Sequence, residues 1–192
     1  MAKPPTDTNT VEVRSRDELR DWLGKFHGNS TGIWLVHYKK SSPHYLPIGD
    51  IVAECLAHGW VDSLTRRKDD LRSMHWIAPR KQGSNWSVTN KKLVAELEAS
   101  GLMTDAGRVA VESAKTDGSW ARLEAVERLE VPKDLAVAFS VHPGSKAHWG
   151  AFTESVRRKN LVWILTAKRP ETRAKRVRVI AESAEANEWV DQ

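Results

Sequence analysis

The stretch GWVDSLTRRKDDLRSMHWIAPRKQGSNWS, residues 59–87, decides the fold of this chain. Two runs within it, residues 60–67 and 71–77, are rich in side chains that favour strands. Between them lies Lys68-Asp69-Asp70, whose aspartates suit a turn. The pattern therefore predicts a β-hairpin that starts directly after a helix stopped by Gly59.

The segments before this hairpin predict a helix, a strand and a second helix. Ser15-Arg16-Asp17-Glu18 has the pattern of a capping box, and apolar residues follow at helical spacing up to Gly28. Residues 32–39, GIWLVHYK, are apolar on both faces and too short for a helix, which indicates a central strand. Pro47 can occupy the first turn of the second helix. The expected buried stripe of that helix is Ile48, Ile51, Val52, Cys55 and Leu56.

The segments after the hairpin carry helical signals only. Ser84 or Ser87 can cap one helix, and Thr104 can cap the next. In the second of these helices the expected inward residues are Ala106, Val109, Ala110 and Ala114. Beyond Pro132 the expected core residues are Leu135, Phe139, Trp149, Phe152, Trp163, Ile164, Val177 and Ile180.

This order of elements predicts an α+β fold. We expect a small antiparallel sheet, made of a central strand and a hairpin, packed with helices and followed by an all-helical C-terminal part. The expected organisation is a disordered tail at residues 1–10, an α+β domain at 11–120 and a helical region at 121–192.

Composition limits the class of protein. The 192 residues suit one domain with an appended part, and the single cysteine, Cys55, cannot form an internal disulfide. We see neither a secretory signal nor an apolar run long enough to span a membrane, so we expect a cytoplasmic protein. No cofactor motif is present, and we expect none to be bound.

Positive charge is concentrated near the C-terminus, within a chain whose formal net charge is +5. Glu171 alone opposes nine basic residues in residues 157–178: Arg157, Arg158, Lys159, Lys168, Arg169, Arg173, Lys175, Arg176 and Arg178. Such a cluster attracts phosphates, acidic partners or anionic ligands. It can equally be the solvated face of a helix, and the sequence leaves both readings open.

The quoted stretch also contains the best candidate for a binding site. Trp60 and Asp62 share one face of a strand, and Arg80 follows the paired strand. Arg80 is the expected partner of Asp62, directly or through one water. The candidate ligand-binding residues here are Trp60, Asp62, Arg80, Ser84, Trp86 and Asn90. Together they would form a pocket for an anion or small ligand; alternatively, the aspartate and arginine only pair and the tryptophans only fill the core.

Other chemical signatures are weak. Cys55 and His58 lie three positions apart on a predicted helix, but a metal site needs three or four ligands and no second pair has suitable spacing, so we predict no metal site. His37 is expected to be an ordinary strand residue. His75 is a candidate acid–base group.

Five longer segments are distinctive: GIWLVHYKK, ECLAHGWVDS, APRKQGSNWSVTN, LMTDAG and LVWILTAKRPETRAKRV. Together they resemble the YdeI/OmpD-associated, or bacteriocin-protection, family. The family name implies a role in stress, or in resistance to bacteriocins or cationic peptides. The resemblance adds Lys168, Arg169 and Arg173 to the ligand-binding candidates and supplies no catalytic residues.

Three functions remain open. The first is a binding module for a small anionic molecule or peptide. The second is non-specific nucleic-acid binding through the basic C-terminal helices. The third is an enzyme that uses Asp62 or His75 for proton transfer, a reading that lacks a nucleophile–base pair or a metal. The oligomeric state is not indicated.

Overall fold

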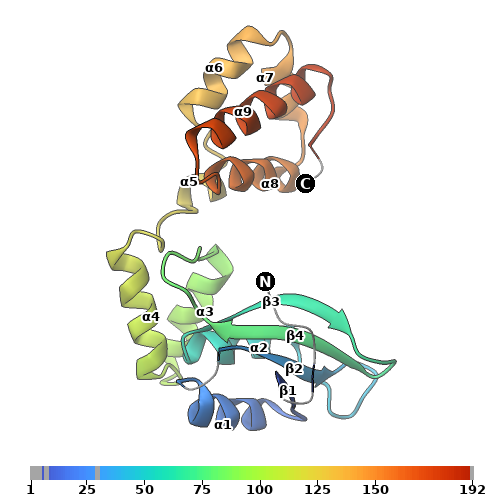
Figure 1. Ribbon diagram of the computed structural model, residues 1–192, viewed down its shortest axis with the longest axis vertical. Coiled ribbons are helices and arrows are strands. Elements are labelled where there is room, and N and C mark those ends of the chain that lie inside the picture. The colour runs from blue at the N-terminus through green and yellow to red at the C-terminus, as the bar shows by residue number, and fades with distance from the viewer. Residues whose placement is uncertain (1–5, 7–8, 29–30, 191–192) are drawn as a thin grey trace. The chain divides into compact units, whose positions relative to one another are not determined.

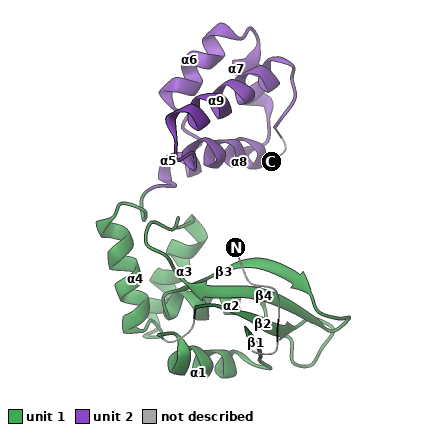
Figure 2. Ribbon diagram, viewed as in Figure 1, with its two compact units in different colours: residues 1–121 green, residues 122–192 purple. Residues whose placement is uncertain are grey.

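The computed structural model describes residues 6, 9–28 and 31–190, and it divides into two compact units (Figure 1). Unit 1 comprises residues 1–121 and unit 2 comprises residues 122–192 (Figure 2). A sheet with helices forms unit 1, and the regular structure described in unit 2 is helical. The predicted α+β class with an all-helical C-terminal part is confirmed.

The sheet of unit 1 has four strands in the order β1-β2-β4-β3. Their bounds are β1 Thr10–Glu12, β2 Ile33–Tyr38, β3 Trp60–Arg67 and β4 Arg72–Pro79. The predicted hairpin is β3 and β4, which pair antiparallel, and the predicted central strand is β2, which pairs antiparallel with β4. At the hairpin turn the carboxylate of Asp69 accepts hydrogen bonds from the amides of Leu71 and Arg72.

One strand was not predicted. β1 pairs parallel with β2, so the sheet is mixed rather than antiparallel. Three residues are too few to show the alternation that identifies a strand. Of the predicted tail, residues 1–5 and 7–8 lie outside the described residues, whereas Thr10 already belongs to β1.

The helices of unit 1 begin where the sequence predicts. Their bounds are α1 Arg16–Phe26, α2 Ile48–Ala57, α3 Val88–Ala99 and α4 Asp105–Thr116. Ser15, Ser87 and Thr104 each cap a helix by accepting a backbone amide. The Glu18 carboxylate accepts the amide of Arg14 rather than that of the cap residue Ser15, so the second hydrogen bond of the predicted capping box is shifted by one residue.

The core of unit 1 has two layers that share α2. Leu19 and Leu23 of α1 and Ile51 and Cys55 of α2 pack on the face of the sheet formed by Ile33, Leu35, Trp60 and Ile77. The opposite side of α2 packs against α3, α4 and Trp86. Because α2 lies between two layers, six of its residues are buried.

Two predicted core residues are exposed. Ile48, in the first turn of α2, is 44% exposed, and Val109 of α4 is 69% exposed. The buried face of α4 instead runs through Gly107, Val111 and Ala114. Gly107 sets this face because its missing side chain lets α4 approach the backbone of α2.

Unit 2 contains five helices among its described residues: α5 Glu124–Glu127, α6 Lys133–Val141, α7 Ser145–Ala151, α8 Glu154–Leu165 and α9 Pro170–Glu185. Its buried core includes six of the predicted residues: Leu135, Phe139, Trp149, Ile164, Val177 and Ile180. Phe152 and Trp163 are partly buried against them. The helical pattern therefore located most of this core correctly.

Candidate functional site

The candidate site lies where the chain leaves the sheet and enters α3. Arg80 continues the pairing of β4, since its amide donates to the carbonyl of Gly59 at 2.9 Å. The chain then turns at Gly83, whose φ of +74° is a conformation that glycine adopts without strain. Ser87 ends the loop by capping α3 through the amide of Asn90. Hydrogen bonds therefore fix the loop at both ends.

The Arg80 guanidinium lies over the Trp86 ring of this loop. Its carbon is 3.9 Å from the centre of the Trp86 ring, and Nη1 donates to the carbonyl of Asn85 at 2.9 Å. Nε and Nη2 are buried, and neither has a hydrogen-bond partner among the described residues. Burial lowers the pKa of Arg80 to about 10, although the negative charge of Asp62 opposes this. Arg80 is still cationic at neutral pH.

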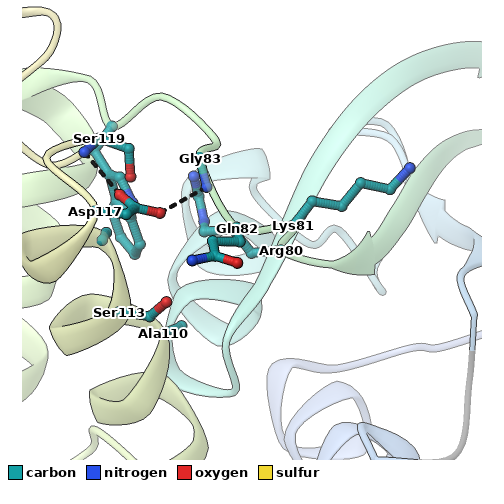
Figure 3. Close-up of a pocket in the computed structure, with 10 residues that line it drawn as sticks. Arg80, Lys81, Gln82, Gly83, Ala110, Ser113, Asp117 and Ser119 are labelled. Atoms are coloured by element: carbon teal, nitrogen blue, oxygen red, sulfur yellow. Dashed lines mark hydrogen bonds between the residues drawn. The ribbon is translucent and has the colours of Figure 1, made fainter.

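The C-terminal end of α4 supplies the opposite wall. The carboxylate of Asp117 accepts the amide of Gly83 at 2.9 Å and the amide of Ser119 at 2.8 Å, so it connects the two sides (Figure 3). The Ser119 hydroxyl is buried and has no hydrogen-bond partner among the described residues. Lys81 extends away from this region into solvent (Figure 3).

Between these walls is a small polar cavity of about 40 Å³. Its lining consists of Arg80, Lys81, Gln82, Gly83, Trp86, Ala110, Ser113, Ala114, Asp117 and Ser119. A space of this size holds roughly three waters, or the head group of a small ligand. Buried donors without a partner are uncommon in proteins, and two of the lining residues, Arg80 and Ser119, carry three such atoms.

Of the residues predicted in this region, Arg80 and Trp86 meet at the cavity. Ser84 lies in the same loop and donates to the Lys81 carbonyl at 2.6 Å, and Asn90 lies in the first turn of α3. Neither lines the cavity. Trp60 belongs to the core, where it packs edge-on against Trp22 at 5.8 Å. The prediction that Trp60 borders this pocket is wrong.

Asp62 is half-buried on β3. Its charge acts on Arg80, Cys55 and His75, so it faces the same side of the sheet as the helices. No hydrogen bond or ion pair joins it to Arg80, whose Nε and Nη2 both lack partners among the described residues. The direct pairing is therefore wrong, because the guanidinium turns to stack on Trp86; a water-mediated contact stays a prediction.

Sequence reasoning missed the α4 side of the cavity. Asp117, Gly118 and Ser119 follow the helix directly, and an aspartate before Gly-Ser is a usual turn signal. That signal predicts a turn but not its partner, which lies 34 residues earlier at Gly83. Trp120 was also missed; its ring is 5.0 Å from that of Trp86.

His75 is buried beside His37, with 4.8 Å between the ring centres. Burial lowers the pKa of both imidazoles, and the charge of His75 lowers that of His37 further. The Thr65 hydroxyl is 3.4 Å from Nδ1 of His75. The lowered pKa therefore favours the neutral form of the His75 imidazole within the sheet.

Cys55 and His58 are both buried on α2. Burial raises the pKa of the Cys55 thiol, and Nδ1 of His58 is 2.9 Å from the carbonyl of Glu54. Within the described residues, no group of three or more His, Cys, Asp or Glu side chains is placed to hold a metal ion.

The remaining predicted residues belong to unit 2. Lys168 and Arg169 are exposed between α8 and α9. Arg173 instead forms a two-pronged contact with Asp134, at 2.7 Å and 3.0 Å. Burial alone would raise the pKa of Asp134, but Arg173 outweighs it and the net shift is downward. Arg173 thus has a partner in the fold.

Comparison with known proteins adds two family matches. A family described as "Domain of unknown function (DUF8412)" matches residues 11–110, and one described as "Bacteriocin-protection, YdeI or OmpD-Associated" matches residues 128–187. No curated protein and no solved structure matches the chain. Over the residues that the structure describes, we find no helix with the length and apolar character needed to cross a membrane.

The first match covers four of the five sequence pieces that resemble the YdeI/OmpD-associated family, and it also covers the Arg80 loop. The fifth piece, LVWILTAKRPETRAKRV, lies within the second match. The chain therefore belongs to the DUF8412 family through its α+β unit, and its helical unit matches the family described as bacteriocin-protection, YdeI or OmpD-associated.

Proposed function

We propose that unit 1 is a binding module for the anionic group of a small molecule or peptide, which it holds in the cavity beside Arg80. The observation that carries this proposal is the pair of unpartnered donors, Nε and Nη2, on Arg80. These two atoms form one edge of the guanidinium. Such an edge donates two parallel hydrogen bonds to two oxygens of one carboxylate or phosphate.

The surroundings of Arg80 support an anion rather than a neutral group. Trp86 covers one face of the guanidinium, and Asn85 occupies Nη1, so the remaining edge is held in place. The Ser119 hydroxyl supplies a further donor. Leaving such groups unpaired costs about 1–3 kcal/mol for each, and more for a charged one, which favours a ligand that satisfies them.

Asp117 is the only carboxylate in the cavity lining, and its position limits its effect on a bound anion. Its two oxygens accept the amides of Gly83 and Ser119. The carboxylate thereby holds the loop in place rather than pairing with Arg80. It also disfavours highly charged anions, so a carboxylate or singly charged phosphate ester fits better than a trianion.

The cavity accepts a head group only, because its volume is about 40 Å³. The rest of the ligand must extend outside. The C-terminal carboxylate of a peptide has this form, and a peptide ligand agrees with the bacteriocin-protection description of the second family match.

The proposal is tested by isothermal titration calorimetry with acetate, inorganic phosphate and short peptides that carry either a free or an amidated C-terminus. We expect Arg80→Gln to weaken anion binding by roughly 10- to 100-fold, because a charged hydrogen bond contributes about 1.5–3 kcal/mol. Ser119→Ala should weaken binding by roughly fivefold.

Arg66→Gln is the matched control. Arg66 also lies over a tryptophan ring, that of Trp34 at 4.9 Å, but it does not line the cavity. This variant should bind anions as the wild type does. Wild-type protein that binds none of the anions, or equal loss in the Arg66 and Arg80 variants, would overturn the proposal.

A further inference from the structure

A second surface with a distinct composition lies along α8 in unit 2. Ser155, Arg158, Lys159, Val162, Trp163 and Thr166 line a groove of about 380 Å³. Their spacing of three, four, seven, eight and eleven residues places them on one face of the helix. The face combines basic side chains with a half-buried indole.

Arg176 of α9 fixes one end of this groove. Its guanidinium carbon is 5.1 Å from the centre of the Trp163 ring. Nη1 donates to the carbonyl of Trp163, and it also donates to the hydroxyl of Thr166 at 3.2 Å. The guanidinium therefore lies over the Trp163 ring as a cation–π pair, and two hydrogen bonds hold it there.

The basic side chains of unit 2 differ in whether a carboxylate pairs with them. Arg158 pairs with Glu127, Arg173 with Asp134 and Arg178 with Glu182. Within the described part of the chain, no carboxylate pairs with Lys168, Arg169 or Arg176. Lys168 and Arg169 directly follow the α8 end of the groove and are exposed. Uncompensated positive charge is thus concentrated beside the Trp163 stack.

We infer that this face of unit 2 is a binding surface for single-stranded nucleic acid. Exposed cations that follow a groove contact successive phosphates, and aromatic or guanidinium planes stack on unpaired bases. An acidic peptide would contact the basic side chains but would not stack on the Trp163–Arg176 pair. A duplex would not stack there either, because its bases are already stacked on one another. The surface lies in unit 2 and is independent of the Arg80 cavity.

The inference is tested by fluorescence anisotropy of the full chain with a labelled oligo(dT) over a range of salt concentrations. Lys168→Gln/Arg169→Gln removes two exposed cations at the α8 end of the groove. We expect this variant to bind about fivefold more weakly or worse. The slope of log affinity against log salt should fall in magnitude by about 1.4, since each phosphate contact on a single strand contributes about 0.7.

Lys133→Gln/Lys146→Gln is the charge-matched control. Both of its lysines are exposed and lie in the same unit, on α6 and α7 rather than beside the groove. It should retain wild-type affinity and salt slope. Equal weakening in both double variants would show attraction to net charge alone and would overturn the inference.

Competition experiments separate the possible partners. An abasic oligomer and poly-glutamate should each displace the oligo(dT) at least tenfold less well than unlabelled oligo(dT), because neither can stack. An abasic oligomer that competes equally well would overturn base stacking, and poly-glutamate that competes equally well would identify an acidic-protein surface instead. A wild-type chain that does not bind oligo(dT) at low salt would refute the inference outright.

Discussion

At the scale of single residues, two buried charged groups of unit 1 differ in whether the fold supplies their partners. Glu54 of α2 is fully buried, and the fold supplies its partners. Nε of Arg16 lies 2.6 Å from one carboxylate oxygen, and Nε of Arg20 approaches the other within 3.0 Å. This arrangement joins α1 to α2. Arg80 has one edge that is unpartnered among the described residues.

Removal of the Glu54 carboxylate should therefore destabilise unit 1. We expect Glu54→Ala to lower the free energy of unfolding by about 3 kcal/mol, at the low end for a broken buried pair. The two arginines are 29–37% exposed and can be rehydrated, which limits the loss. Urea denaturation measures it. Glu96→Ala, which removes an exposed partner of Lys92, should change stability by less than about 1 kcal/mol; an equal loss in both variants would contradict this account.

The residues also show what sequence alone could predict about the site. Arg80 and Trp86 lie within one loop, so their proximity followed from their closeness in the chain. Trp60 and Asp62 were predicted to share one strand face, but the direct pairing of Asp62 with Arg80 is wrong, because sequence cannot reveal that the guanidinium lies over an indole ring. Ser119 was missed because its place depends on where α4 packs.

At the scale of elements, local sequence signals predicted the helix caps correctly, whereas apolar spacing did not predict which face of α4 is buried. The caps at Ser15, Ser87 and Thr104 follow from hydrogen bonds within a few residues, and sequence identifies them. The buried face of α4 depends instead on its contact with α2. The apolar Val109 predicted that its own face of α4 is buried, but that residue is exposed. The buried face is the one that contains Gly107, which lies against the backbone of α2.

The contact between α2 and α4 should consequently be sensitive to one methyl group. A Cβ at Gly107 would lie 2.4 Å from the Ala57 carbonyl oxygen and 2.5 Å from the Met103 sulfur. We expect Gly107→Ala to destabilise unit 1 by about 3 kcal/mol, the upper part of the range for overpacking. Gly24→Ala, inside α1, meets no atom within 4 Å and should stabilise by about 0.5–1 kcal/mol. Chemical denaturation of both variants measures these changes, and a neutral Gly107→Ala would show that the helices can separate at little cost.

At the scale of the whole molecule, the two units differ in the titratable groups that link their stability to acid. Unit 1 buries three histidines, His37, His58 and His75, and burial is the main cause of the lowered pKa of each. Asp62 partly offsets this effect at His75, and Glu54 partly offsets it at His58. Among the described carboxylates of unit 2, the one with a clearly shifted pKa is Asp134: burial acts to raise its pKa, and Arg173 brings it below the ordinary value.

Acid should therefore weaken the two units in different pH ranges. Below about pH 6.5 the unfolded chain protonates its histidines while the buried imidazoles of unit 1 stay neutral, so the free energy of unfolding of unit 1 falls with pH. In unit 2 the stability supplied by Asp134 is present above the pKa of an unfolded aspartate, about 3.9, and is lost as pH falls below that value. Between pH 7 and 5, hydrogen exchange should accelerate in β2, α2 and β4 before it does in α6 and α9.

Hydrogen exchange read by mass spectrometry, corrected for the intrinsic effect of pH, resolves these segments. His75→Gln should reduce the pH dependence in β4, whereas His44→Gln, at an exposed position, should leave it unchanged. The two buried rings 4.8 Å apart also resist simultaneous protonation, since two like charges at that distance repel strongly away from water. Equal acceleration in both units over this range would show that the buried histidines do not control acid stability.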